Sequence, residues 1–145
     1  MRKKWVYQAI DQLSEKDIVW HPTPESNSIA NLIFHIRGTV RQRLETIFFN
    51  EPEKRDRDKE FERGLQLSKK QALTLANESF DAIIQILEEI KLKPQLLLWQ
   101  PYQTMPPLTY SSNDNDSTLL DMMVQMVREV HNHTGQIMYI AKMRK

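Results

Sequence analysis

The stretch that decides the fold is residues 28–50, SIANLIFHIRGTVRQRLETIFFN. Its apolar residues recur at intervals of three and four, which places them along one stripe of an α-helix. Ser26 or Ser28 can cap the N-terminus of this helix, and Asn50 and Pro52 favour its termination. We therefore predict one long amphipathic helix with a buried stripe. The stripe consists of Ile29, Ile33, Ile36, Val40, Leu44 and Ile47.

Three further segments show the same spacing of apolar residues, so we predict three more helices. The first covers about residues 3–13, and residues 14–17, SEKD, look like the cap of another short turn. Ser68 caps the third long helix, and Asp116 or Ser117 caps the fourth, which should reach almost to the C-terminus. The residues expected to face inward on the third helix are Ala72, Ala76, Phe80, Ile83, Leu87 and Ile90.

Two long connections separate these helices. Residues 51–67 are strongly charged, and residues 93–114 contain four prolines and no helical period. We expect the second connection to be an extended crossover that could include a short strand pair. The sequence thus predicts an all-α fold, a four-helix bundle with two long crossover connections. Its length predicts a single domain over residues 1–145.

The composition narrows the class of protein. There is no cysteine, so disulfides and thiolate metal ligands are excluded. Twenty Lys and Arg against nineteen Asp and Glu give a net charge of +1 without the basic stripe that nucleic-acid binding favours. No apolar run could span a bilayer and no signal peptide is evident, so we expect a cytoplasmic protein that binds neither membrane nor nucleic acid. Phe48 and Phe49 offer an apolar flank suited to a homodimer.

The four histidines are the candidate functional residues. Positions four apart on a helix share one face, whereas positions two apart differ by about 200° around the axis. His133 therefore pairs with Glu129, and His131 cannot reach the same site from a regular helix. His133 lies in the apolar stripe of the fourth helix, so we expect it to face the bundle interior. His35 lies at the margin of its stripe, in line with Leu32, Thr39 and Gln42.

Two interpretations of these residues remain open. In the first, Glu129 hydrogen-bonds His133 and His35 bonds a threonine or glutamine, which satisfies a buried polar layer without any ligand. In the second, His35, Glu129 and His133 hold a metal ion. Two imidazoles and a carboxylate suit zinc, nickel or ferrous iron, and an open position would let the metal activate water or a thiol.

The charged run at residues 55–61, RDRDKEF, also has a simple interpretation. Alternating arginine and aspartate are typical of a solvated loop whose charges neutralise one another. Phe61 could pin such a loop to the end of the bundle.

Residues 28–42, SIANLIFHIRGTVRQ, together with RDRDKEF and with residues 133–142, HTGQIMYIAK, resemble the DinB/YfiT-like superfamily of metal-binding four-helix bundles. The resemblance is closest to an uncharacterised branch that carries an RDRDxEF element after the second helix. It covers most of the chain, although residues 62–118 match by helix pattern alone. It implies a nickel or zinc ion held by one histidine on the second helix and two on the fourth.

The histidines carry over to His35 and His133, whereas the third ligand position holds Glu129 in place of the family histidine. A carboxylate can replace an imidazole in a divalent site, so the metal prediction is weakened rather than abolished. Characterised relatives include thiol-dependent transferases and a maleylpyruvate isomerase, and several members are dimers. The resemblance thus implies a metal-dependent, thiol-dependent transferase or hydrolase-like enzyme for a small molecule. The alternative is a non-catalytic bundle or binding module whose metal site has been lost.

Overall fold

The computed structural model describes residues 2–101 and 117–145, and every regular element in these ranges is a helix. The long helices are α1 (Arg2–Asp11), α3 (Ile29–Val40), α5 (Lys69–Leu92) and α6 (Leu119–Met143). A π-helical segment, η1 (Arg41–Thr46), continues α3. The short helices are α2 (Glu15–Ile18), α4 (Arg57–Glu60) and the 3₁₀ helix η2 (Pro94–Leu98). None of the helices in these ranges has the length and apolar character needed to cross a bilayer.

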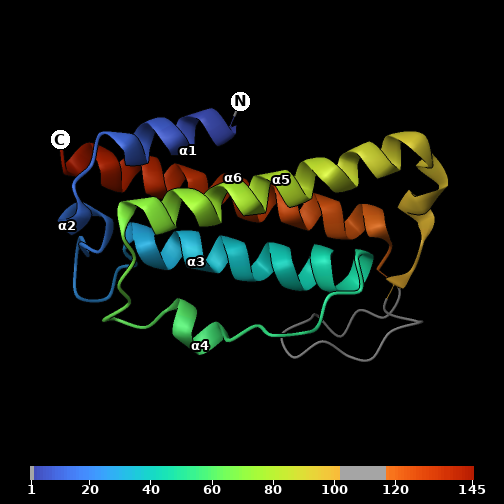
Figure 1. Cartoon of the computed structure of the whole chain (residues 1–145), viewed down its shortest axis with the longest axis horizontal. Coiled ribbons are helices and arrows are strands. Elements are labelled where there is room, and N and C mark those ends of the chain that lie inside the picture. The colour runs from blue at the N-terminus through green and yellow to red at the C-terminus, as the bar shows by residue number, and fades with distance from the viewer. Residues whose placement is uncertain (1, 102–116) are drawn as a thin grey trace.

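The four long helices pack side by side (Figure 1). α3 lies against α5 and α6, and α1 lies against the same two helices. α2 and α4 lie on the connections at the edge of this bundle. The predicted all-α bundle is therefore confirmed. Its core includes the fully buried side chains of Ile10, Ile29, Ile33, Leu44, Ile86 and Ile137.

α3 follows its sequence pattern closely. Ser28, rather than Ser26, is its N-cap: the Ser28 hydroxyl accepts from the Asn31 backbone N–H, and the Asn31 side chain accepts from the Ser28 N–H. All six residues of the predicted stripe are buried. The helical path ends at Asn50, whose φ of 55° lies in the left-handed region that asparagine tolerates better than most residues. The π-helical turn of η1 was not predicted, because the apolar spacing does not reveal it.

α5 starts after the predicted cap, Ser68, but its buried face differs from the prediction. Leu87 is 49% exposed, so its predicted inward position was wrong. Ala72 and Ala76 are buried as predicted, whereas Phe80, Ile83 and Ile90 are only partly buried. The buried stripe runs instead through small residues and one isoleucine, because small side chains let neighbouring helices approach closely: Ala72, Ala76, Ser79, Ala82 and Ile86.

The connections contain helical turns that the sequence did not reveal. Residues 94–98 form a 3₁₀ helix within the segment predicted to be extended, and α4 lies within the first charged connection. Residues 102–114 of this predicted crossover, which could include a short strand pair, lie outside the described residues. α6 is capped by Thr118, one residue beyond the predicted Ser117.

Asp17 joins the predicted cap of α2 to the end of the chain. Its carboxylate accepts from the hydroxyl and the backbone N–H of Ser14 and from Nε of Arg144, 2.7 Å away. The Arg144 guanidinium lies 4.6 Å from the ring centroid of Trp20. The Ser14 hydrogen bonds, followed by the Arg144 guanidinium, lower the pKa of Asp17 from 3.8 to about 2. Ionised Asp17 therefore holds the α2 turn and the C-terminus together.

Replacing Asp17 should make the free energy of unfolding change less as the pH is lowered into the acid range. Because the folded-state pKa is lowered, the carboxylate contributes stability above its unfolded pKa and loses it as the pH falls from about 4 to about 2. We expect Asp17→Asn to lower the free energy of unfolding by about 1 kcal/mol at neutral pH, with the difference vanishing in acid. Urea unfolding at several pH values measures this. Asp58→Asn, in an exposed side chain, serves as the control, and equal acid sensitivity of Asp17→Asn and the unsubstituted protein would contradict the account.

Candidate metal centre

The three residues predicted to bind metal lie together between α3 and α6. His35 projects from α3, while Glu129 and His133 project from successive turns of α6, and their ligand atoms all lie within 4.8 Å of one another. Oε2 of Glu129 lies 3.2 Å from Nε2 of His133 and 3.7 Å from Nε2 of His35. The two imidazole rings meet edge to face. His131 is exposed on α6 and does not belong to the cluster, and the spacing had predicted that it could not reach the site of His133.

The two imidazoles are held more firmly than the carboxylate. The side chain of His35 is 9% exposed and that of His133 is 13% exposed, whereas that of Glu129 is 47% exposed. His133 lies between the buried residues Val130 and Ile137 of the apolar stripe of α6. The site is therefore closed on the side of the core and open to solvent at Glu129.

The other nitrogen of each ring faces a hydrogen-bond acceptor. Nδ1 of His35 lies 2.8 Å from Oε2 of Glu60, and Nδ1 of His133 lies 2.8 Å from Oε1 of Gln136. Nη2 of Arg55, a donor, also lies 3.4 Å from Nδ1 of His35, but the shorter contact is to the carboxylate of Glu60. Because a carboxylate only accepts hydrogen bonds, the shorter contact favours a proton on Nδ1 of His35. The same arrangement at His133 favours the Nδ1–H tautomer there as well. In neutral histidines with this tautomer, both Nε2 atoms carry a lone pair.

These lone pairs face the carboxylate of Glu129, which is also an acceptor. With both rings in this tautomer, three acceptors face one another, and either an added proton on a ring or a metal ion among them would satisfy all three. Oε2 of Glu129 lies 3.2 and 3.7 Å from the two Nε2 atoms, close to the roughly 3.3 Å between two ligand atoms of a tetrahedral zinc with bonds of about 2.0–2.1 Å. An Nδ1 hydrogen bond to a carboxylate is also the usual support of a histidine that binds metal through Nε2. The donor set therefore fits a divalent cation.

Glu60 is itself buried and firmly held. Its side chain is 2% exposed, and that of Arg55 is 4% exposed. Nε and Nη2 of Arg55 donate to the two oxygens of Glu60 at 2.8 and 3.0 Å. Arg55 also donates to Thr39 Oγ1 at 3.0 Å and to Gln42 Oε1 at 2.9 Å. A bidentate ion pair thus anchors the residue that orients His35.

Further contacts hold the α4 segment against α3. Nδ2 of Asn31 donates to the backbone carbonyls of Glu60 and Glu62 at 2.9 and 3.0 Å. The Phe61 ring lies 4.9 Å from the His35 ring, centroid to centroid, so Phe61 covers one side of the imidazole. The backbone of residues 60–62 is therefore held in place by Asn31, which also belongs to the cap of α3.

Two sequence predictions about this region were wrong. The RDRDKEF run is not simply a solvated loop, because its first and sixth residues, Arg55 and Glu60, are buried in an ion pair. The partner of His35 is Glu60 rather than a threonine or glutamine, and Thr39 and Gln42 bind Arg55 instead. Glu60 lies 25 residues from His35 in the chain. No local pattern reveals such a long-range contact.

Gly38 makes the approach of Glu60 to α3 possible. An ideal Cβ at this position would lie 1.9 Å from Oε1 and 2.8 Å from Cδ of Glu60. Any side chain here would therefore displace the carboxylate that orients His35. A glycine one turn after a buried histidine is the sequence signal that could have indicated a close approach at this point.

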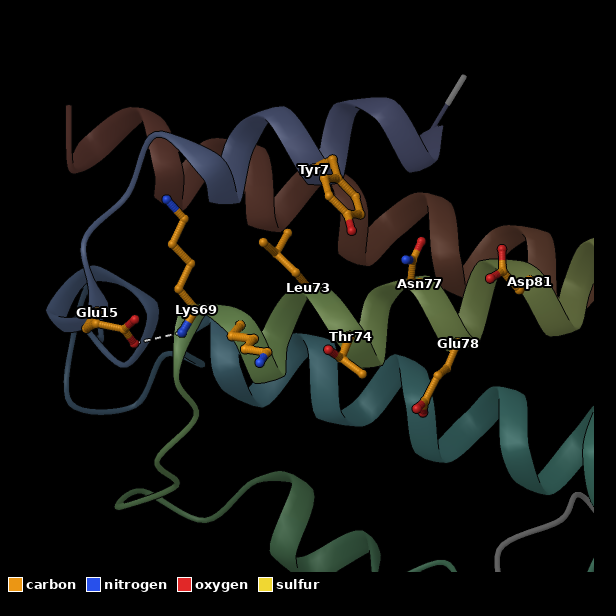
Figure 2. Close-up of a pocket in the computed structure, with 9 residues that line it drawn as sticks. Tyr7, Glu15, Lys69, Leu73, Thr74, Asn77, Glu78 and Asp81 are labelled. Atoms are coloured by element: carbon orange, nitrogen blue, oxygen red, sulfur yellow. Dashed lines mark hydrogen bonds between the residues drawn. The ribbon is translucent and has the colours of Figure 1, made fainter.

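Two hollows lie near these elements. One of about 580 Å³ lies between α1 and α5, and Figure 2 shows it with Tyr7 above Leu73 and Asn77. It lies away from the histidines, which face the gap between α3 and α6. The other hollow, of about 360 Å³, is lined in part by Leu32 and Gln136. Leu32 and Gln136 each lie one helical turn from a histidine of the cluster, but none of the three candidate ligands lines this hollow.

Comparison with known proteins identifies one family. A family model with the description "Protein of unknown function (DUF1572)" matches residues 1–145, the whole chain. No curated protein and no solved structure matches the chain significantly.

Adding a methyl group at Gly38 should disrupt the Glu60 pocket. We expect Gly38→Ala to lower the free energy of unfolding by about 1–3 kcal/mol, because Glu60 must move and leave buried partners unsatisfied. Gly135→Ala is the matched control, since a Cβ at this helical position meets no atom within 4 Å. The control should be neutral or stabilising by up to about 1 kcal/mol. Urea denaturation measures both, and a Gly38→Ala protein as stable as the control would contradict this account of the pocket.

Proposed function

This chain belongs to the DUF1572 family of unknown function, and we propose that it binds a divalent metal ion through His35, Glu129 and His133. One observation carries the proposal: the imidazoles of buried His35 and partly buried His133 point the same nitrogen, Nε2, at one carboxylate oxygen, while their Nδ1 atoms face other acceptors. Among protein sites, this arrangement is typical of metal ligands supported by a second layer of hydrogen bonds.

Zinc or nickel is the proposed ion. Imidazole suits both metals, and the chain contains no cysteine that could provide a softer ligand. The resemblance to the DinB/YfiT-like superfamily, and to its branch with an RDRDxEF element, supports the same choice. It provides only His35 and His133, so Glu129 as third ligand rests on the geometry of this chain.

We propose that the metal serves an enzyme acting on a small molecule, as a thiol-dependent transferase or a hydrolase-like protein. A divalent ion at this place would supply Lewis acidity to a bound water or low-molecular-weight thiol. Glu129, on the solvent side, leaves the ligand set accessible. The hollow of about 360 Å³ has the size of a small-molecule site, and its wall mixes apolar Leu32 and Ile140 with the amide of Gln136.

A non-catalytic bundle or binding module is the competing proposal. The specific observation in its favour is the contact of 3.2 Å between Glu129 and His133, which is a hydrogen bond if Nε2 of His133 is protonated. In that case Glu129 has replaced the metal as partner of His133. The two proposals differ in whether metal stabilises the protein.

Metal binding is tested on the full chain purified without an affinity tag or chelator. We expect about one zinc or nickel ion per chain by elemental analysis. At 100 times its dissociation constant, the ion should stabilise the fold by about 2.7 kcal/mol, which would raise the melting temperature by roughly 5–10 °C. His35→Ala and His133→Ala should abolish both effects.

His131→Ala provides the matched control, because this histidine is exposed on the same helix and should leave metal binding unchanged. The Glu129→His variant restores the third histidine of the superfamily pattern. If the Glu129→His variant binds metal and the unsubstituted chain does not, the non-catalytic proposal is favoured. A protein that binds neither ion, in either form, would refute a metal site on this scaffold.

We also propose that a second copy of the chain is the protein partner. Phe48 and Phe49, the flank suggested by the sequence, are partly buried and pack against the core, so we propose a more exposed face as the interface. An exposed apolar face lies on α5 and α6, beside a hollow lined by Ile84 and Val127. The shorter helix α1 runs along only part of these two helices (Figure 1). α1 has 10 residues and α5 has 24, which makes them about 15 and 36 Å long. The five aliphatic residues on this face are 45–56% exposed: Ile84, Leu87, Leu120, Val124 and Val127.

The charges around this face suit a second copy better than a membrane surface. By helical spacing, three basic and three acidic residues of α1, α5 and α6 flank this face, so their formal charges cancel. A helix pair that binds anionic lipid would carry a basic rim instead. A neutral rim allows two identical faces to meet without net repulsion. The flanking residues are Lys3, Lys91 and Arg128, with Asp81, Glu88 and Asp121.

If the chain dimerises through this face, one charged side chain introduced at its centre should prevent dimerisation. We expect the unsubstituted chain to be a dimer and Val127→Lys to be a monomer, because a lysine in the centre of an apolar interface is costly to bury. Leu98→Lys, at a residue 75% exposed in η2, should leave the dimer intact. Light scattering after size-exclusion chromatography gives the mass. A monomeric unsubstituted chain, or a Val127→Lys dimer, would contradict the proposed interface.

A further inference from the structure

We infer that Glu60, clamped by Arg55, is the positioning residue that makes His35 a metal ligand, and that metal binding and docking of residues 53–62 are coupled. This inference rests on the proposed metal site, but it concerns residues outside the ligand set. Glu60 accepts from Nδ1 of His35 at 2.8 Å, which leaves Nε2 as the coordinating atom. Without Glu60, the ring of His35 would be free to change tautomer and to rotate.

Glu60 is suited to this role because it cannot reorient. Arg55 donates to both of its oxygens, and Arg55 is in turn held by Thr39 and Gln42 of the α3–η1 path. Glu53 extends the network, accepting from Gln42 Nε2 at 3.0 Å and from the backbone N–H of Arg55 at 2.9 Å. The hydrogen bonds thus run without a break from the connection before α4 to the nitrogen that determines the tautomer of His35.

The burial of this ion pair supports positioning rather than stability as its purpose. The free energy needed to remove two charges from water offsets much of the attraction between them. An apolar pair of similar volume would therefore usually stabilise the fold as well or better. The chain nevertheless places both charges in side chains less than 5% exposed, beside a glycine that leaves room for one of them. What an apolar pair could not provide is an acceptor for Nδ1 of His35.

Coupling in the opposite direction follows from thermodynamic linkage. If docking of residues 53–62 raises metal affinity by some factor, metal must favour docking of the same residues by the same factor. Loss of a carboxylate that supports a ligating histidine commonly lowers metal affinity 10–100-fold. The segment should therefore exchange its amide hydrogens more slowly when metal is bound, while distant parts of the fold change little.

The test compares zinc affinity among full-length variants by competition with a chromogenic chelator. The double variant Arg55→Met/Glu60→Leu removes the acceptor but leaves no unpaired buried charge, so it should remain folded. We expect its zinc affinity to fall 10–100-fold, with Glu60→Gln in between because an amide oxygen can still accept from Nδ1. Glu62→Gln is the matched control, since this side chain is exposed two residues away and should bind zinc normally.

Two readouts separate positioning from a merely structural role. Nitrogen NMR of the metal-free protein should show His35 protonated on Nδ1 in the unsubstituted chain and without that preference in the double variant. Hydrogen exchange should show zinc protecting residues 55–62 in the unsubstituted chain alone. If the double variant does not fold, Glu60→Gln carries the affinity comparison, with a smaller expected fall because its amide oxygen can still accept from Nδ1. Zinc affinity equal to that of the unsubstituted chain would then contradict the positioning role.

The outcomes distinguish this inference from the proposed function. Equal zinc affinity in the unsubstituted chain and the folded double variant would overturn the positioning role and leave the metal site standing. An unsubstituted chain that binds no metal would refute the proposed function and the coupling with it. Zinc affinity that falls as expected, together with the change in His35 protonation, would support both.

Discussion

A carboxylate buried away from water must be surrounded by donors, and this requirement organises the centre of the molecule. Glu60 meets it with the guanidinium of Arg55 and with Nδ1 of His35. For Glu60 to reach these donors, the segment before α5 must lie along α3. Asn31 holds this segment through the backbone on either side of Phe61, and Gly38 leaves room for the carboxylate because it has no side chain. The direction of Nε2 of His35, and hence the character of the site, depends on this one contact.

The site can be understood as a balance of charge. With neutral histidines, Arg55 contributes one positive charge, while Glu60 and Glu129 contribute two negative charges. The arginine offsets Glu60, so Glu129 is the carboxylate left to attract a cation. A histidine in place of Glu129, as in the superfamily pattern, would bring no negative charge. A site with Glu129 and a bound divalent ion would therefore carry one positive charge less than a site with three histidines. The acceptor cluster that Glu129 forms with the two Nε2 atoms is the reason to expect a cation there at all.

Local physics made most of the helices predictable. The stripe of α3, the caps at Ser28 and Ser68, and the convergence of Glu129 with His133 all follow from spacing within one turn or one helix. The meeting of His35 with that pair was one of two interpretations of the residues, and the resemblance added support for the two histidines. The packing of α3 against α6 brings the three side chains together. Glu60 and Arg55 were missed because a run of alternating charges has the same local pattern whether it is solvated or buried. The choice is made by partners such as Thr39 and Gln42, which lie far away in the sequence. The misplaced Leu87 has a similar cause, since small residues on α5 shifted the buried face toward Ser79 and Ala82.

The most direct test of the central claim is a crystal structure of the untagged protein grown with nickel or zinc, with anomalous scattering measured at the absorption edge of that metal. The account predicts one anomalous peak bounded by Nε2 of His35, Nε2 of His133 and the carboxylate of Glu129, with Nδ1 of His35 still hydrogen-bonded to Glu60. A structure with metal present in the crystal but no peak at this place, or with His35 turned so that Nδ1 binds the metal, would contradict it.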